Sequence, residues 1–204
     1  MDDNLDHDNR KYSVESLTVL TEDYIMRMIN QALAVFLQAL GLKKAGQFSQ
    51  ALQVFDQALE GLLGLNARLA KQLDDRQLLD MLTFQDKLDV DRLLMIADIY
   101  REEGEVHALQ GQPEQSRLAA QRSLRLYLEA ALATEARPTI ELVQKIEAQR
   151  SSLTAPDLPV ETRLALLDYL DRLLASGEDF LAAAGLSPRD LQLAIASLDT
   201  ADLH

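Results

Sequence analysis

The stretch that decides the fold of this chain is Gly46-Gln47-Phe48-Ser49-Gln50-Ala51-Leu52-Gln53-Val54-Phe55-Asp56-Gln57-Ala58-Leu59. It opens with a glycine, which ends helices readily because it adopts left-handed backbone angles without strain. Apolar residues then recur every three or four positions, the period of an amphipathic helix. We predict one helix that ends before Gly46 and another over about residues 47–63. A link this short makes them antiparallel neighbours.

The helix before Gly46 is predicted to begin at Thr21, whose side chain can cap the first turn. Its apolar face comprises Ile25, Met28, Ile29, Ala32, Phe36 and Leu40. Residues 1–17 are acidic and lack helical periodicity, so we expect a mobile acidic tail there. Residues 18–204 are then a single helical domain, with a possible sub-boundary at the proline-containing stretch 151–159.

A second hairpin is expected further along the chain. Asp89 can cap a helix that runs to Gln110, and the turn Gly111-Gln112-Pro113 leads into a helix over about residues 114–134. Between the hairpins, residues 64–88 form a connecting element with a short helix at 77–82. Helices resume after Pro138, at 160–175, at 178–184 and after Ser187, and no strand is expected. The fold class is therefore all-α, with antiparallel helix hairpins.

Composition excludes several functions before any motif is considered. The net charge of −13 removes the attraction to phosphate that dominates nucleic-acid binding, and it disfavours anionic membrane surfaces. Uninterrupted apolar runs are too short to span a bilayer. Without cysteine the chain has no disulfide or thiolate chemistry, and its N-terminus lacks the basic and apolar segments of a secretory signal. We expect a cytoplasmic protein that binds neither nucleic acid nor membrane.

The stretch 46–59 resembles the central part of a tetratricopeptide (TPR) repeat, in which glycine forms the turn and small residues allow close helix contact. The second hairpin repeats part of this pattern. The residues that carry the resemblance, expected to pack the repeats, are Ala39, Gly46, Phe48, Ala51, Phe55, Ala58, Tyr100, Gly104 and Gly111. Val35 replaces the usual bulky residue, and a middle repeat is missing or remodelled. The run Glu22–Ile29 followed by Leu40–Gly46 also resembles an uncharacterised bacterial family of short TPR-like proteins.

The resemblance implies hairpins stacked as a right-handed superhelix, or a compact helical array, whose first helices line a concave face. The residues that it places on this face are Phe36, Leu40, Lys43, Lys44, Asp98, Arg101 and Glu105. It implies a non-enzymatic module that binds a protein or peptide, or that self-associates as a homodimer. The alternative is a sensor that holds a small apolar or peptide ligand between the hairpins, near Phe36, Leu40, Tyr100 and Tyr127.

Candidate chemistry is sparse. Glu103 and His107 are one helical turn apart and could pair as an acid–base couple, which is the enzymatic alternative. The remaining histidines are His7 and His204, close to the chain ends, so no set of three metal ligands is visible. Glycine-rich phosphate loops and nucleophile motifs are absent from the sequence. We expect no enzymatic activity, no cofactor and no metal.

Overall fold

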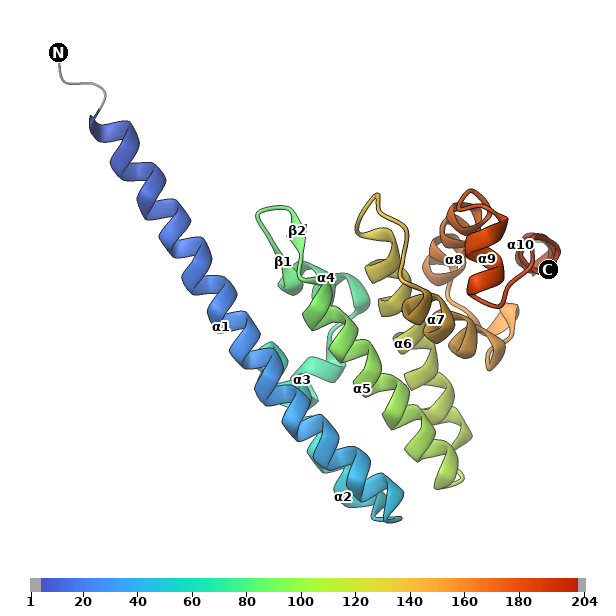
Figure 1. The fold of residues 1–204 in the computed structure, drawn as a ribbon. Helices are drawn as coiled ribbons and strands as arrows, with labels where there is room; N and C mark the ends of the chain where they lie inside the picture. The colour runs from blue at the N-terminus through green and yellow to red at the C-terminus, as the bar shows by residue number, and fades with distance from the viewer. Residues whose placement is uncertain (1–4, 202–204) are drawn as a thin grey trace.

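The part of the chain described by the structure, a computed structural model, is all-α apart from two strands of two residues each. The backbone is described for residues 5–201 and the side chains for residues 23–198. The elements are α1 (Leu5–Lys44), α2 (Phe48–Leu63), α3 (Ala67–Gln72), α4 (Asp75–Leu82), β1 (Thr83–Phe84), β2 (Lys87–Leu88), α5 (Val90–Leu109), α6 (Pro113–Leu132), α7 (Ile140–Ser151), the 3-10 helix η1 (Ala155–Asp157), α8 (Val160–Leu174), α9 (Glu178–Ala183) and α10 (Pro188–Ala201). Figure 1 shows the hairpins α1–α2 and α5–α6 side by side, followed by the C-terminal helices.

The first hairpin forms as the sequence predicts. Gly46 has a φ of 73°, in the left-handed region that a glycine turn requires. Ala39, Ala51 and Ala58 are fully buried between α1 and α2, because methyl groups let the two backbones approach closely. The rings of Phe36 and Phe55 pack with their centroids 5.7 Å apart.

Helix α1 is much longer than predicted. It begins at Leu5, so Thr21 is not its N-cap, and residues 5–17 are helical where a tail without regular structure was expected. Residues 1–4 of that tail lie outside the described residues. The N-terminal half of α1 extends past the rest of the molecule, because α2 is only 16 residues long and runs beside the C-terminal half (Figure 1).

The connecting segment contains two features that were not expected, the short helix α3 and a pair of strands. The short helix α4 begins one residue after Asp74, which forms a reciprocal capping box with Gln77. Two-residue strands β1 and β2 follow as a small antiparallel hairpin, although no strand was predicted. Its turn holds Gln85 and Asp86 at positive φ, and two residues per strand are too few to show alternation in a sequence.

The second hairpin, α5–α6, is the centre of the domain. Asp89 caps α5 by accepting a hydrogen bond from the backbone N–H of Arg92, as predicted, and Pro113 occupies the first turn of α6. A Cβ at Gly104 would lie 3.3 Å from the carbonyl oxygen of Ser116, so glycine is needed for the close approach of these helices. Helix α6 also packs against α7 and α8, which places it between the first half of the domain and the C-terminal helices.

The residues expected at repeat-packing positions mostly lie in the core. Tyr100 and Gly104 are buried, Phe48 is partly buried against the core, and Gly46 and Gly111 form the left-handed turns. The possible sub-boundary at 151–159 contains the end of α7, η1 and a loop anchored by buried Leu158. The stacking of the hairpins as a TPR superhelix stays a prediction.

Candidate interaction surface

The apolar residues predicted to line a concave face lie elsewhere. Phe36 is only 7% exposed and packs on Phe55, so its assignment to a binding face is wrong. Leu40 is partly buried against the same core. Phe36 is covered by Phe55 of α2, within the hairpin itself, and α5 also packs against α1.

The charged residues predicted for that face bind one another. Lys43 of α1 donates a 2.6 Å hydrogen bond to Glu102 and another to Glu105, both on α5. Arg101 lies 2.6 Å from Glu102 and 3.2 Å from Glu105. Burial lowers the pKa of Lys43, but the two carboxylates outweigh burial and raise the pKa above its ordinary value. These charges therefore join the two hairpins, while Lys44 is exposed and has no ion pair among the described residues.

Asp98 extends the ionic row from α5 to α7. It accepts a 3.0 Å hydrogen bond from Lys145 and a further one from the hydroxyl of Tyr127. Burial and the neighbouring Asp98 raise the pKa of the Tyr127 hydroxyl above its ordinary value. From Lys43 to Lys145, the cationic side chains and the carboxylates of this row pair with one another. The row therefore offers little unpaired charge to a ligand.

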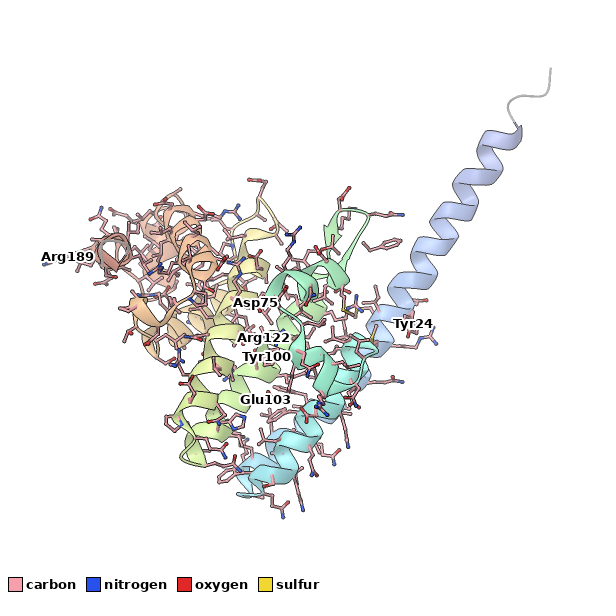
Figure 2. All side chains as sticks on the ribbon, turned by 180° about the vertical axis from the view of Figure 1, so that it is seen from behind. Tyr24, Asp75, Tyr100, Glu103, Arg122 and Arg189 are labelled. Atoms are coloured by element: carbon pink, nitrogen blue, oxygen red, sulfur yellow. The ribbon has the colours of Figure 1, made fainter. Side chains whose placement is uncertain are left out.

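A second polar network lies on another side of α5, and Figure 2 shows part of it from behind. Lys71 lies 2.8 Å from Glu103 and 2.5 Å from Asp56, which joins α3 to α5 and α2. Burial raises the pKa of Glu103 although Lys71 is adjacent. The guanidinium of Arg122 lies 4.7 Å from the ring centroid of Tyr100 and donates hydrogen bonds to the backbone carbonyls of Lys71 and Leu73, at the end of α3.

The proposed acid–base pair is not formed. Nδ1 of His107 lies 2.7 Å from Oε1 of Gln112, whereas the carboxylate of Glu103 binds Lys71. A general base needs its orienting carboxylate within hydrogen-bond reach. Across the described residues, no group of three histidine or acidic side chains could hold a metal ion.

The surface feature that the sequence reasoning missed is the outer face of α1. Large apolar side chains are exposed there, namely Met26 (51%), Leu33 (38%) and Leu37 (57%), while Tyr24 (64%) is exposed on another side of the helix. No charged residue occurs between Arg27 and Lys43. Exposed apolar patches of this kind mark interaction surfaces. The absence of charge over several helical turns, on both faces of the helix, was the signal available in the sequence.

The same segment differs from the expectation that no part of the chain is apolar enough over a sufficient length to span a membrane. By length and composition alone, Asp23–Lys44 is apolar enough to cross one, a property that counting uninterrupted apolar runs overlooked. The segment lies near the N-terminus, and only 17% of its apolar window is buried inside the protein. Ala32, Phe36 and Ala39 pack one face of it into the protein core.

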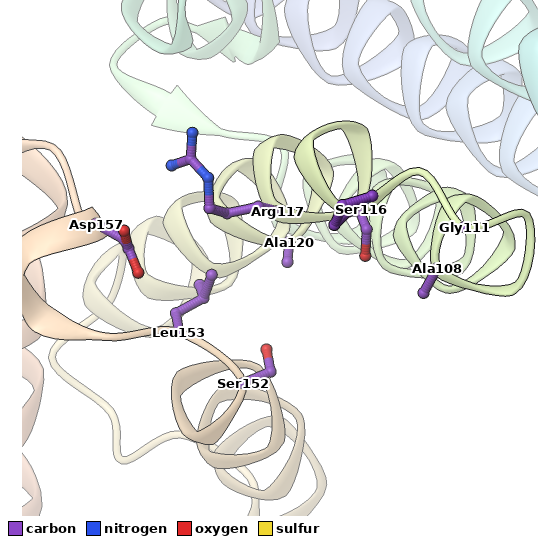
Figure 3. Close-up of a pocket in the computed structure, with 9 residues that line it drawn as sticks. Ala108, Gly111, Ser116, Arg117, Ala120, Ser152, Leu153 and Asp157 are labelled. Atoms are coloured by element: carbon purple, nitrogen blue, oxygen red, sulfur yellow. The ribbon is translucent and has the colours of Figure 1, made fainter.

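A cavity of about 630 Å³ lies between the α5–α6 turn and the end of α7 (Figure 3). Its walls are formed by Ala108, Gly111, Pro113, Ser116, Arg117, Ala120, Ser152, Leu153 and Asp157. Small and polar residues predominate, and Arg117 is already bound by Glu114. None of the residues predicted to hold a ligand lines this cavity, and the side chains of Phe36, Tyr100 and Tyr127 are buried in the core.

Comparison with models of known protein families gives no match, and neither curated proteins nor solved structures give a significant match. The resemblance to TPR proteins stays a prediction. Function is therefore inferred from the chain's own geometry.

Proposed function

We propose that this chain is a non-enzymatic helical module, of the TPR-like class, that binds a protein or associates with itself through the outer face of α1. The observation that carries the proposal is the exposure of Leu33 and Leu37 in the helix segment 28–42, which has no charged residue, together with the exposure of Met26 just before it. Leaving such side chains in water is unfavourable by about 25 cal/mol per Å² of apolar surface. A partner that covers them recovers this free energy.

The rest of the molecule supports a scaffold role for the other residues. The ion pairs of α5 are directed at α1, α3 and α7, so they fix the helices relative to one another. Rigid helices lower the cost of binding, because less conformational freedom is lost when the partner docks.

Site-specific photo-crosslinking tests this function. A photoreactive residue at Leu37 should give covalent protein adducts in cells that express the chain. The matched control is Leu193 on α10, which is 60% exposed but isolated from the α1 face. Adducts of any protein at position 37 and not at 193 support the proposal, and their absence at 37 overturns it.

A second candidate function is the sensing of a small molecule in the cavity beside Ser152. Its volume of about 630 Å³ lies within the range of known ligand sites. Native mass spectrometry of the purified chain should then show a bound mass that is lost in Ser152→Trp, which fills the cavity. An identical mass spectrum for the bound species in both proteins would contradict this candidate.

A further inference from the structure

The exposed face of α1 has the spacing of a coiled-coil seam. Asp23, Met26, Asn30, Leu33 and Leu37 follow one another at intervals of three, four, three and four residues. Gly41 and Lys44 lie beyond Leu37 on the same side, although the step from Leu37 to Gly41 repeats an interval of four, and every one of these residues is exposed. Apolar residues at alternating intervals of three and four form the contact line of paired helices.

We infer that this face pairs with the same face of a second copy of this chain, with the two α1 helices antiparallel. The inference rests on the proposed function and names the partner. In a symmetric dimer each copy presents the same patch, so the patch must be complementary to itself. In an antiparallel pair, Leu33 of one copy faces Leu37 of the other, so the patch is complementary to itself there.

If two copies of this chain associate, their charge favours contact through this face over contact through other faces. Each copy carries a net charge of −13, so two copies repel one another over most of their surfaces. From Met26 to Gly41 the seam has no charged residue, and no carboxylate occurs between Asp23 and Asp56. This face therefore permits close contact with the least repulsion.

Charge also selects the antiparallel orientation. The seam has Asp23 near one end and Lys44 at the other. A parallel pair would place each of these residues opposite its own copy, and like charges at facing positions are destabilising. An antiparallel pair centred between Leu33 and Leu37 places Asp23 at the lysine-bearing end of the other helix, and Met26 opposite Lys44.

The size of the seam sets the expected strength. The segment Asp23–Lys44 has 22 residues, which is about 33 Å of helix and about three heptads. A contact of this length is smaller than that of a stable obligate dimer. We therefore expect a reversible dimer whose population depends on concentration.

Sedimentation and cross-linking of the full chain test the inference. Sedimentation should show a concentration-dependent dimer, and Leu33→Glu with Leu37→Glu should raise its dissociation constant roughly 100-fold or more, because four buried leucines become carboxylates. The control Leu193→Glu adds a charge at an equally exposed leucine of α10 and should leave the dimer unchanged. Circular dichroism of each variant distinguishes lost pairing from lost folding.

The orientation is tested with introduced thiols, since the chain has no cysteine of its own. A mixture of Met26→Cys and Lys44→Cys chains should cross-link through a short bifunctional maleimide, while Met26→Cys alone should not. Self-cross-linking of Met26→Cys overturns the antiparallel pair. A monomer at all concentrations overturns the dimer; if position 37 still gives adducts with another protein, the proposed function stands. Binding of the monomer to phospholipid vesicles, lost in the double glutamate variant, would instead assign this face to a membrane.

Discussion

Lys43 in the last turn of α1 donates a 2.6 Å hydrogen bond to Glu102 in the middle of α5. Both side chains are largely buried, with 15% of Lys43 and 7% of Glu102 exposed. Arg101 lies on the other oxygen of Glu102 at 2.6 Å. The contact joins the first hairpin to the second, so these residues belong to an intramolecular interface and not to an open ligand face.

Replacing Lys43 by methionine should therefore destabilise the fold. The substitution removes one partner of a buried carboxylate, and breaking a buried pair costs about 3–5 kcal/mol. Because Arg101 still neutralises Glu102, we expect a smaller loss of about 1–3 kcal/mol in the free energy of unfolding. Urea denaturation measures it. Lys44→Met is the matched control, since Lys44 is exposed, and equal effects of both substitutions would argue against the buried pair.

Phe36 and Leu37 are neighbours on α1, but they should contribute very differently to the free energy of unfolding. Phe36 is buried on Phe55, whereas Leu37 is 57% exposed. Phe36→Ala should lower the free energy of unfolding by about 3–5 kcal/mol, the usual cost of removing a buried aromatic ring. Leu37→Ala should change it by less than about 0.5 kcal/mol in the monomer, as exposed substitutions do. Denaturation at low protein concentration checks both values, and a mild effect of Phe36→Ala would restore it to a binding face.

The local hairpins could be predicted from the sequence because their signals are local. Gly46 and Gly111 mark turns through backbone angles, and Asp89 caps α5 through a hydrogen bond three residues away. The binding face could not be predicted equally well. Phe36 is covered by Phe55 of the same hairpin, whereas only the position of α5 shows that Lys43 is covered. The sequence did not predict that α1 begins at Leu5, because the apolar residues of this acidic stretch do not recur with a clear helical period.

Gly104 and Gly61 provide a test of the α5–α6 contact. Both glycines lie inside helices, where alanine is favoured by up to about 1 kcal/mol. A Cβ at Gly61 meets no atom within 4 Å, so Gly61→Ala should raise the free energy of unfolding by about 0.5–1 kcal/mol. At Gly104 the Cβ would press on the Ser116 carbonyl at 3.3 Å and offset that gain. Equal stabilisation by Gly61→Ala and Gly104→Ala in thermal or urea unfolding would show that the helices are not tightly packed there.

The buried tyrosines make the fold sensitive to alkaline pH. Burial raises the pKa of Tyr100 to about 12, and burial also raises the pKa of Tyr127 and Tyr169. In the unfolded chain these hydroxyls ionise near their ordinary pKa of about 10. The folded state then holds protons that the unfolded state has lost. Stability should be fully present below pH 10 and should fall as the pH rises beyond it, by up to about 1.4 kcal/mol per pH unit for each tyrosine.

Two phenylalanine substitutions separate the roles of these hydroxyls. The hydroxyl of Tyr127 donates to Asp98, so Tyr127→Phe should cost about 1.5–3 kcal/mol at neutral pH. The buried hydroxyl of Tyr169 has no hydrogen-bond partner among the described residues, so Tyr169→Phe should be neutral or should stabilise by about 1 kcal/mol. Both substitutions should reduce the loss of stability above pH 10. Urea denaturation at neutral pH and above pH 10 measures these effects, and an unchanged alkaline slope in both variants would show that these tyrosines do not ionise on unfolding.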